Sequence, residues 1–594
     1  GPGLLGPRDP PRATRAKKEL WSWVNVWSIG TVIIAAAVMV PIVAVIFIGL
    51  TPSDDIWSHL ASTVLPLYIS TTLQLMIGVG VGTLTIGVGT AWVVSTCRFP
   101  GKRLFEWALL LPMAMPAYVI AYVYTDILEY AGPVQEVLRD IFGWTLKRDY
   151  WFPEIRSLGG AASMMTLVLY PYVYLLSRAA FMEQSVCVLE ASRILGRGPW
   201  RSFCTVALPL ARPAIVIGVS LVLMETLNDF GTVDFFAVGT FTLGIYDVWL
   251  NMNNVAGAAQ LAGVMLFFVV FLMLAERFAR RKQRFHTTTA KFKALPGYQL
   301  KGAPKRFATV ACALPVLFGF LLPAMVLGGY AVTNFDAAAN AEVLRHAGNS
   351  VLLSSVVALL ALGIGVFMAY GVRLRKEKIV TFVVRFASLG YAVPGSVLAI
   401  GVLVSLGGLD NGIDGFMRRN FGLSTGLVFS GTIAAVTFGY LVRFLALSFG
   451  SVEASLSKIT PNMDGAAASL GHGPFSTLKR IHLPLIRGSA LTAVILVFVE
   501  CMKELPMTMI LRPFNFHTLA TYVHQFASDE QLGEASLAAL AIVGFGILPV
   551  IVLSFAITKS RPGHSTEEPT SGRGFMSSVS PIPLGIIRFW ITSP

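Results

Sequence analysis

Residues 190–209 read EASRILGRGPWRSFCTVALP, and residues 465–484 read GAAASLGHGPFSTLKRIHLP. The Gly-x-Gly-Pro of each copy and its closing Leu-Pro coincide without a gap when the stretches are aligned 275 positions apart. Each copy also lies between long apolar runs. A match at one fixed spacing indicates a duplicated chain, and such an internal repeat decides the architecture before any single helix is assigned.

The composition is that of a membrane protein. The 594 residues are 55% hydrophobic and only 13% charged, and the mean hydropathy is +0.69. The formal net charge of +14 suggests nucleic acid as a partner, but the basic residues lie in short loops between apolar runs, as in cytoplasmic loops of membrane proteins. We therefore expect a lipid bilayer and no nucleic acid. The five scattered cysteines contain no CxxC pair and are interpreted as free thiols.

Twelve apolar runs are long enough to cross a hydrocarbon layer of about 30 Å at about 1.5 Å per residue. The sequence therefore predicts an all-α polytopic membrane protein with about twelve transmembrane helices in two parallel six-helix repeats. The expected spans are 26–49, 68–96, 104–130, 159–182, 208–228, 258–276, 307–331, 349–371, 379–405, 424–449, 485–508 and 535–557.

The charge of the loops predicts the orientation. Loops 50–67 and 229–257 contain no Lys or Arg, whereas the linker 276–306 and the repeated stretches are basic. Because cytoplasmic loops carry an excess of Lys and Arg, the basic side is expected to face the cytoplasm. Both termini then lie in the cytoplasm.

The chain divides at its linker. We expect a cytoplasmic N-terminal tail over 1–25 and a first membrane-spanning half over 26–280. A basic cytoplasmic linker, 281–306, leads to a second half over 307–558. The Ser-, Pro- and Gly-rich tail 559–594 is predicted to be disordered.

The duplication reaches beyond the repeated stretch. At an offset of 278 Pro116 aligns with Pro394, and at an offset of 275 Glu225 aligns with Glu500. Six spans in each half leave both halves starting on the same side of the membrane. Parallel repeats of this kind place a pathway at their interface.

Each repeated stretch has the composition of a small two-helix projection. A helix-favouring segment ends at Gly196 or Gly471, as helices commonly end at glycine. Pro199 or Pro474 then suits the first turn of the next helix. Two copies at identical spacing favour a functional device over an ordinary loop.

At these residues the chain resembles the membrane permeases of binding-protein-dependent ABC importers. Their signature is Glu-Ala-Ala, three residues, Gly, nine residues and Ile-x-Leu-Pro. The second copy departs from it, because Gly465 stands where the family has Glu and Asp464 lies one position earlier. The matching positions are Glu190, Ala191, Ser192, Gly196, Leu208 and Pro209 in the first copy, and Asp464, Gly465, Ala466, Ala467, Gly471, Leu483 and Pro484 in the second.

The resemblance implies a type I ABC importer permease fold in which both stretches are coupling helices for a cytoplasmic ABC ATPase dimer. It also implies a periplasmic or lipid-anchored solute-binding protein. The sequence contains no GxxxxGK[ST] phosphate loop, so ATP and Mg are expected on the ATPase and no cofactor on this chain. The chain is predicted to be a transport subunit and not an enzyme.

Within this family the chain resembles the fused, double-length ferric-iron permeases. The second half has Met-Lys-Glu-Leu-Pro at 502–506 and Thr-Leu-Ala-Thr at 518–521, and the first half has Asn-Asp-Phe-Gly at 228–231. Ferric iron is therefore the expected solute. Thiamine, a polyamine or another small solute remains an alternative, as does a secondary transporter driven by an ion gradient.

Four acids near the ends of predicted spans are candidates for the pathway, because an acid at membrane depth is costly and marks a functional site by default. They are Glu225, Asp229, Glu500 and Glu504. An equal alternative is that pairs such as Glu500–Lys503 only fix helix packing. The metal ligands are unknown at this stage, and His517 and His524 are interpreted as surface histidines.

Overall fold

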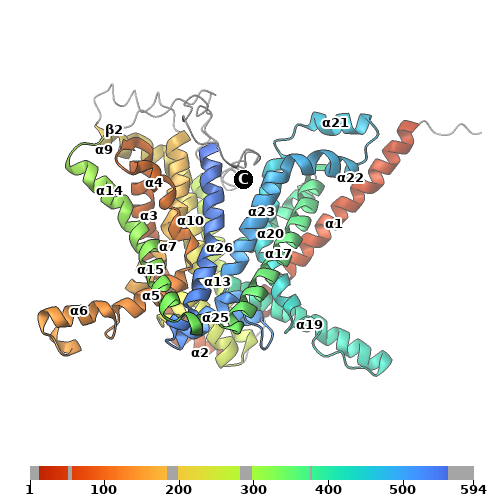
Figure 1. Cartoon of the computed structure of the whole chain (residues 1–594). Coiled ribbons are helices and arrows are strands. Elements are labelled where there is room, and N and C mark those ends of the chain that lie inside the picture. Colours follow the sequence, from red (N-terminus) through yellow and green to blue (C-terminus); the bar gives the residue numbers. More distant parts are fainter. Residues whose placement is uncertain (1–11, 51–55, 184–197, 281–297, 375–377, 560–594) are drawn as a thin grey trace, which may run out of the picture.

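The computed structural model describes residues 12–50, 56–183, 198–280, 298–374 and 378–559. Among these residues, eleven helices are long and apolar enough to cross a membrane, and one further pair of helices forms a bent twelfth candidate. The predicted all-α fold with about twelve spans is confirmed. Figure 1 shows α9 and the α21–α22 segment at one end of the molecule, while α2 and α25 lie at the opposite end.

The first half contains five long helices and one broken segment. The long helices are α1 (Arg12–Gly49), α3 (Leu65–Thr96), α7 (Leu158–Glu183), α10 (Leu208–Asn228) and α13 (Val255–Arg280). The broken segment comprises α4 (Lys102–Ala108), η1 (Leu111–Ala114), α5 (Ala117–Leu128) and α6 (Pro133–Phe142).

The second half repeats this plan. Its long elements are α14 (Ala303–Val316) with η5 (Leu317–Leu321) and α15 (Leu322–Thr333), then α17 (Ala341–Leu374), α19 (Gly395–Phe421), α20 (Ile433–Leu456), α23 (Leu483–Lys503) and α26 (Leu532–Lys559). Before α19 lie α18 (Lys378–Ala387) and η6 (Ser388–Ala392).

Short elements connect the spans. On the side of the repeated stretches these are α9 (Pro199–Ser202), η3 (Phe203–Ala207), α21 (Pro461–Ser469), α22 (Pro474–Thr477) and η7 (Leu478–His482). The others are α2 (Ile56–Thr63), η2 (Lys147–Asp149), α11 (Gly231–Phe235), α12 (Phe241–Tyr246), η4 (Asp247–Asn251), α16 (Phe335–Ala338), α24 (Pro506–Leu511) and α25 (Leu519–Ser528). Strands β1 (Cys97–Arg98) and β2 (Tyr298–Gln299) pair in parallel.

The prediction of one straight helix over 104–130 was wrong. The segments Lys102–Ala114 and Ala117–Phe142 meet at 90°. Pro116 lies at the break in extended conformation, with no amide hydrogen to continue the helix and a ring that disfavours helical geometry before it. Pro394 stands in the same position before α19, so the predicted span 379–405 is likewise divided, between η6 and α19.

Three helices contain a five-residue π-turn immediately before a Leu-Pro pair: η3 before Leu208, η5 before Leu322 and η7 before Leu483. In each, the leucine amide bonds to the carbonyl five residues back. The following proline has no amide hydrogen, and its ring would crowd the carbonyl four residues back. The wider turn accommodates that ring without ending the helix.

The two halves exchange their first helices. The α1 helix packs against α17, α18 and α19 of the second half, while α14 and α15 pack against α4 and α5 of the first. In α1, Trp27 stacks on Phe367 at 4.5 Å between ring centroids. A side chain at Gly371 would lie only 2.3 Å from the Thr31 hydroxyl, so close approach of α1 and α17 requires glycine there. The two large hydrophobic cores therefore each contain residues from both sides of the linker.

Candidate functional site

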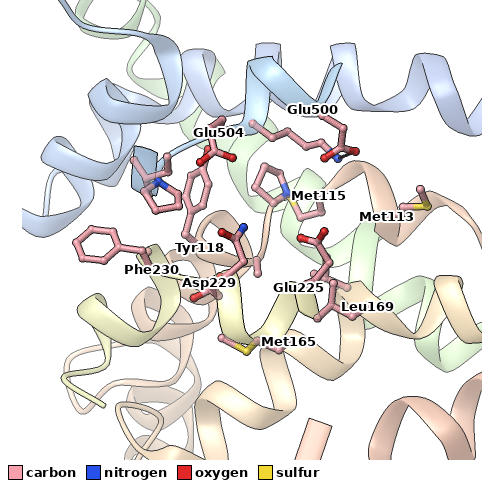
Figure 2. Close-up of a pocket in the computed structure, with 18 of the residues that line it drawn as sticks. Met113, Met115, Tyr118, Met165, Leu169, Glu225, Asp229, Phe230, Glu500 and Glu504 are labelled. Carbon is pink, nitrogen blue, oxygen red and sulfur yellow. Dashed lines mark hydrogen bonds and ion pairs between the residues drawn. The ribbon is translucent and has the colours of Figure 1, made fainter. Parts of the chain in front are cut away.

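A cavity of about 110 Å³ lies between the two halves. Figure 2 shows Glu500 and Glu504 on one side of it and Glu225 and Asp229 on the other. The four acids singled out from the sequence thus surround one space. The wall also includes Met113, Met115, Pro116, Tyr118, Met165, Leu169, Tyr172, Asn228, Arg443 and Lys503.

The acids form two equivalent pairs. Glu225 and Glu500 lie near the ends of α10 and α23, and Asp229 and Glu504 follow each of them four residues later. Both pairs are related by the 275-residue offset of the repeated stretch. The duplication therefore gives each half the same two carboxylates, directed at the same cavity.

The basic groups at the cavity come only from the second half. Arg443 of α20 is buried, and its Nη1 lies 3.2 Å from Glu504 Oε2. Lys503 Nζ lies 3.4 Å from Glu500 Oε1. The second-half acids are therefore held in ion pairs, as a charge in a buried position requires.

The first-half acids have different partners. The Tyr391 hydroxyl donates to Glu225 Oε1 at 3.4 Å. The Asp229 carboxylate accepts from the backbone amides of Thr232 and Val233, at 3.0 and 3.3 Å, where α11 begins. Asp229 thus stabilises the start of a helix, whereas Glu225 accepts a long hydrogen bond from the other half.

Asn228 connects the halves at the cavity wall. Its Oδ1 accepts from Arg443 Nη1 at 2.8 Å and from the Gly395 amide at 2.6 Å. A side chain at Gly395 would lie 2.4 Å from Arg443 Nη1 and 2.6 Å from Glu504 Oε1. Glycine at the start of α19 is therefore needed for this contact, which joins α10 of the first half to α19 and α20 of the second.

The described residues contain no group of three or more His, Cys, Asp or Glu side chains placed to hold a metal ion. The cavity acids stand around a space instead of converging on one point. This arrangement places carboxylate oxygens from both halves around one cavity.

The second repeated stretch is fixed to the membrane helices through Asp464. Arg373 of α17 donates to Asp464 Oδ2 from Nη2 at 2.7 Å and from Nε at 3.1 Å. The same guanidinium donates to the carbonyls of Leu456 and Ile459 at 2.5 and 2.9 Å. His482 Nε2 lies 2.8 Å from Asp464 Oδ1. Asp464 therefore joins α21 to α17 and to the turn before α23.

The other predicted coupling residues of this copy lie on or beside α21. Gly465 and Ala466 are exposed and Ala467 is buried, while Gly471 has a φ of 82°, as expected of a glycine that follows a helix end. Leu483 and Pro484 begin α23, and Leu208 and Pro209 begin α10. Glu190, Ala191, Ser192 and Gly196 of the first copy lie outside the described residues.

The prediction that His524 is a surface histidine was wrong. This side chain is buried, with Nδ1 2.6 Å from the Tyr122 hydroxyl and Nε2 3.3 Å from Asp234 Oδ2. His517 is half-buried beside Arg512. Burial, and then the nearby Arg512 charge, lower the pKa of His517 to about 4, so this imidazole is neutral at neutral pH.

Sequence reasoning missed Arg443 and Asn228. A signal for Arg443 was present, since it stands alone in the apolar stretch Gly-Tyr-Leu-Val-Arg-Phe-Leu-Ala and an ionisable residue inside a span marks a site. The sequence offers no comparable signal for Asn228, because its role depends on the approach of Gly395 from the other half.

The chain is similar to known membrane components of transport systems. The family of binding-protein-dependent transport system inner membrane components matches residues 83–284. An Fe(3+)-transport system permease protein of Haemophilus influenzae is 24% identical over 500 residues, which cover 82% of this chain and 89% of that protein.

Shorter relatives match one third of the chain. A molybdenum transport system permease protein of Escherichia coli is 29% identical over 204 residues, 33% of this chain and 86% of that protein. A sulfate transport system permease protein of Escherichia coli is 30% identical over 207 residues, 33% of this chain and 71% of that protein. With its two repeats and its matched segment, this chain belongs to the inner-membrane components of binding-protein-dependent transport systems.

Proposed function

We propose that this chain is the membrane-spanning subunit of an ATP-driven importer and that ferric iron crosses the membrane through the cavity between its halves. The observation that carries the proposal is the set of four carboxylates, two from each half, around one space whose described lining residues include two basic groups. Carboxylate oxygens suit hard cations. The similarity to an Fe(3+)-transport system permease over most of both chains supports the same solute.

The proposed energy source is a cytoplasmic ABC ATPase dimer, which binds ATP and Mg and docks on both repeated stretches. A solute-binding protein delivers iron at the opposite face. With the repeated stretches on the cytoplasmic side, both termini and the basic loops also lie in the cytoplasm of a bacterium. The Asp464–Arg373 contact supports force transfer, since it ties α21 to a transmembrane helix.

The contacts at the cavity indicate how the two halves would move relative to each other when the cavity opens. The halves meet there through Asn228, Arg443 and Gly395. Movement of α21 and of the first repeated stretch toward each other would tilt the helices to which they are joined. Rigid-body rotation of two packed bodies about their interface is a common form of switching, and in this chain it would break and remake the Asn228 contacts.

A second candidate solute is an oxyanion. Arg443 and Lys503 line the cavity and would bind such an anion, and the molybdenum and sulfate permeases are similar to one third of the chain. Ferric iron and an oxyanion would require opposite charges in the cavity. The acids would attract ferric iron and repel molybdate or sulfate.

Uptake of radiolabelled solutes separates them. Cells that express the chain and cells that lack it should be compared for ferric iron, molybdate, sulfate, thiamine and a polyamine. We expect loss of iron uptake alone in cells without the chain. Unchanged iron uptake with loss of another solute would reject the ferric assignment and keep the importer. Uptake that persists when the ATPase is inactivated would reject the ATP-driven mechanism.

The cavity acids provide the site-specific test. Glu225→Gln and Glu500→Gln should each lower the rate of iron uptake by about tenfold, equivalent to about 1.4 kcal/mol. Glu154→Gln is the matched control, because Glu154 is exposed beyond α6 and far from the cavity wall. Equal uptake by the cavity variants and the control would remove the acids from the pathway.

A further inference from the structure

Two helices extend sideways from the molecule at equivalent places in its halves. The first outer arm is α6 with residues 143–154, and the second is the end of α19, residues 406–421, with residues 422–430. Figure 1 shows α6 and α19 on opposite sides, at the end of the molecule remote from α21. The helix of each arm ends at a glycine in left-handed conformation, Gly143 with a φ of 69° and Gly422 with a φ of 67°.

The first outer arm carries an exposed apolar stripe. Val134, Val137, Leu138, Ile141 and Phe142 follow the 3, 4, 7 and 8 spacing that places side chains on one helix face. The exposed fractions at its outer positions are high, 69% for Ile141 and 60% for Phe142. In a soluble protein such a stripe would be packed against the core.

Two polar side chains of α6, Gln135 and Arg139, form hydrogen bonds with neighbouring parts of the first half. The Gln135 side chain donates to the Leu128 carbonyl at 2.7 Å and accepts from the Tyr150 hydroxyl at 2.5 Å. Arg139 Nη1 donates to the Tyr130 carbonyl at 2.7 Å. These bonds hold Gln135 and Arg139 against the protein, while the apolar stripe and Glu136 on the other face are both exposed, as in an amphipathic helix.

The second outer arm also carries exposed apolar side chains, next to acids that bind its return segment. Asp410 accepts from the amides of Phe429 and Ser430 at 3.0 and 2.7 Å. Asp414 accepts from the Thr425 amide at 2.8 Å and pairs with Arg418 at 2.6 Å. Beside these acids on the same helix lie Leu406, Leu409, Ile413, Phe416 and Met417, of which Leu409 and Phe416 point outward with exposed fractions of 49% and 58%.

We infer that the two outer arms lie in the outer interface of the lipid bilayer, with their apolar stripes against the acyl chains. The outward residues are Val, Leu, Ile, Met and Phe, as on the exposed faces of the spans, for example Ile77 and Val81 of α3. The charges on the arms have both signs, as in Glu136, Arg139, Asp414 and Arg418, so apolar area and not an anionic headgroup provides the attraction.

The arms continue helices that form the cavity wall. The α5 helix begins at Ala117 and Tyr118, which line the cavity, and α19 begins at Gly395, which bonds to Asn228. An arm held at the lipid surface therefore fixes the outer end of the passage on each side. This inference does not depend on which solute is carried.

Spin labels on opposite faces of each arm test the inference. Ile141→Cys and Phe416→Cys lie on the apolar stripes, and Glu136→Cys and Asn411→Cys are exposed on the other face, five residues earlier in each case. The full chain is placed in phosphatidylcholine nanodiscs, and the signal of the labelled but otherwise unsubstituted chain is subtracted. Collision with oxygen, which partitions into lipid, is compared with collision with a water-soluble nickel complex.

We expect oxygen to dominate at positions 141 and 416, and the ratio to reverse at 136 and 411. Dominance of nickel at all four positions would overturn the inference. Labels at 141 and 416 that are accessible to nickel in nanodiscs, and become immobile only when the solute-binding protein is added, would also overturn it and identify the stripes as a protein docking surface.

Discussion

Arg443 is a fully charged side chain in the interior of a membrane protein, and its contacts show how that charge is accommodated. It bonds to Glu504 and Asn228, and 4% of its side chain is exposed. Removing one partner of a buried pair leaves the other charge without compensation, at a cost of about 3–5 kcal/mol. We expect Arg443→Met to lower the stability of the purified chain by that order, measured as the midpoint of thermal unfolding in detergent.

Two further variants test the cause. Arg443→Met combined with Glu504→Leu removes both charges, and replacement of a whole buried pair by apolar groups is often neutral, so the midpoint should recover most of its loss. Arg418→Met breaks an ion pair in which the Arg418 side chain is 62% exposed, a kind of contact that contributes about 0–1 kcal/mol. A double variant as unstable as Arg443→Met would contradict the assignment to an unpaired charge.

At this scale the sequence predicts the acids better than their partners. Glu225 and Glu500 could be found from the repeat alone, because both occur near the end of a span at one offset. The Glu500–Lys503 pair was also open to prediction, because the two residues lie three positions apart on one helix, whereas the Arg443–Glu504 pair was not, because Arg443 reaches Glu504 from a different helix. The burial of His524 was likewise hidden, because Tyr122 and Asp234 come from distant parts of the chain.

At the scale of elements, α21 depends on one side chain for its attachment. Asp464→Asn replaces a carboxylate that accepts two charge-assisted bonds from Arg373, and we expect a loss of about 1–3 kcal/mol in the attachment of α21. The spans should stay folded, because the cores do not include this carboxylate. Iron uptake and co-purification of the ATPase should both fall.

The matched control for this variant is Asp336→Asn, the same chemical change at an exposed position of α16, on the other end of the molecule. It should leave co-purification unchanged. Full retention of the ATPase by Asp464→Asn would show that α21 does not require its contact with Arg373 in order to dock.

The sequence predicts the long spans, but neither the break at Pro116 nor the outer arms. Apolar length predicts the spans because each helix must cover the same hydrocarbon thickness. It does not predict the break at Pro116, since prolines at Pro41 and Pro171 lie inside unbroken helices. Nor does it predict the outer arms, where α6 is too short to be noticed as a span and its apolar stripe faces away from the protein.

For the whole molecule, the linker separates the halves in sequence but not in space. The division into halves over 26–280 and 307–558 remains a prediction, drawn from the repeat in the sequence. Against independent folding of the halves, α1 packs on α17 and α19, while the Tyr124 hydroxyl of α5 donates to the Phe318 carbonyl of η5 at 2.8 Å. Each half thus lacks part of its own core when the other is absent.

Cleavage in the linker tests this exchange. A protease site between Arg280 and Tyr298 should be cut without separating the halves, which should elute together in mild detergent because apolar packing holds α1 on the second half. Thr31→Cys removes the hydroxyl that a side chain at 371 would meet, and with Gly371→Cys it should form a disulfide that keeps the fragments together in sodium dodecyl sulfate, since a Cβ at position 371 would lie 3.5 Å from the Thr31 Cβ. Ile33→Cys with Gly371→Cys is the control, because Ile33 faces outward. Separation of the cut halves in mild detergent would mean that each retains its own first helix.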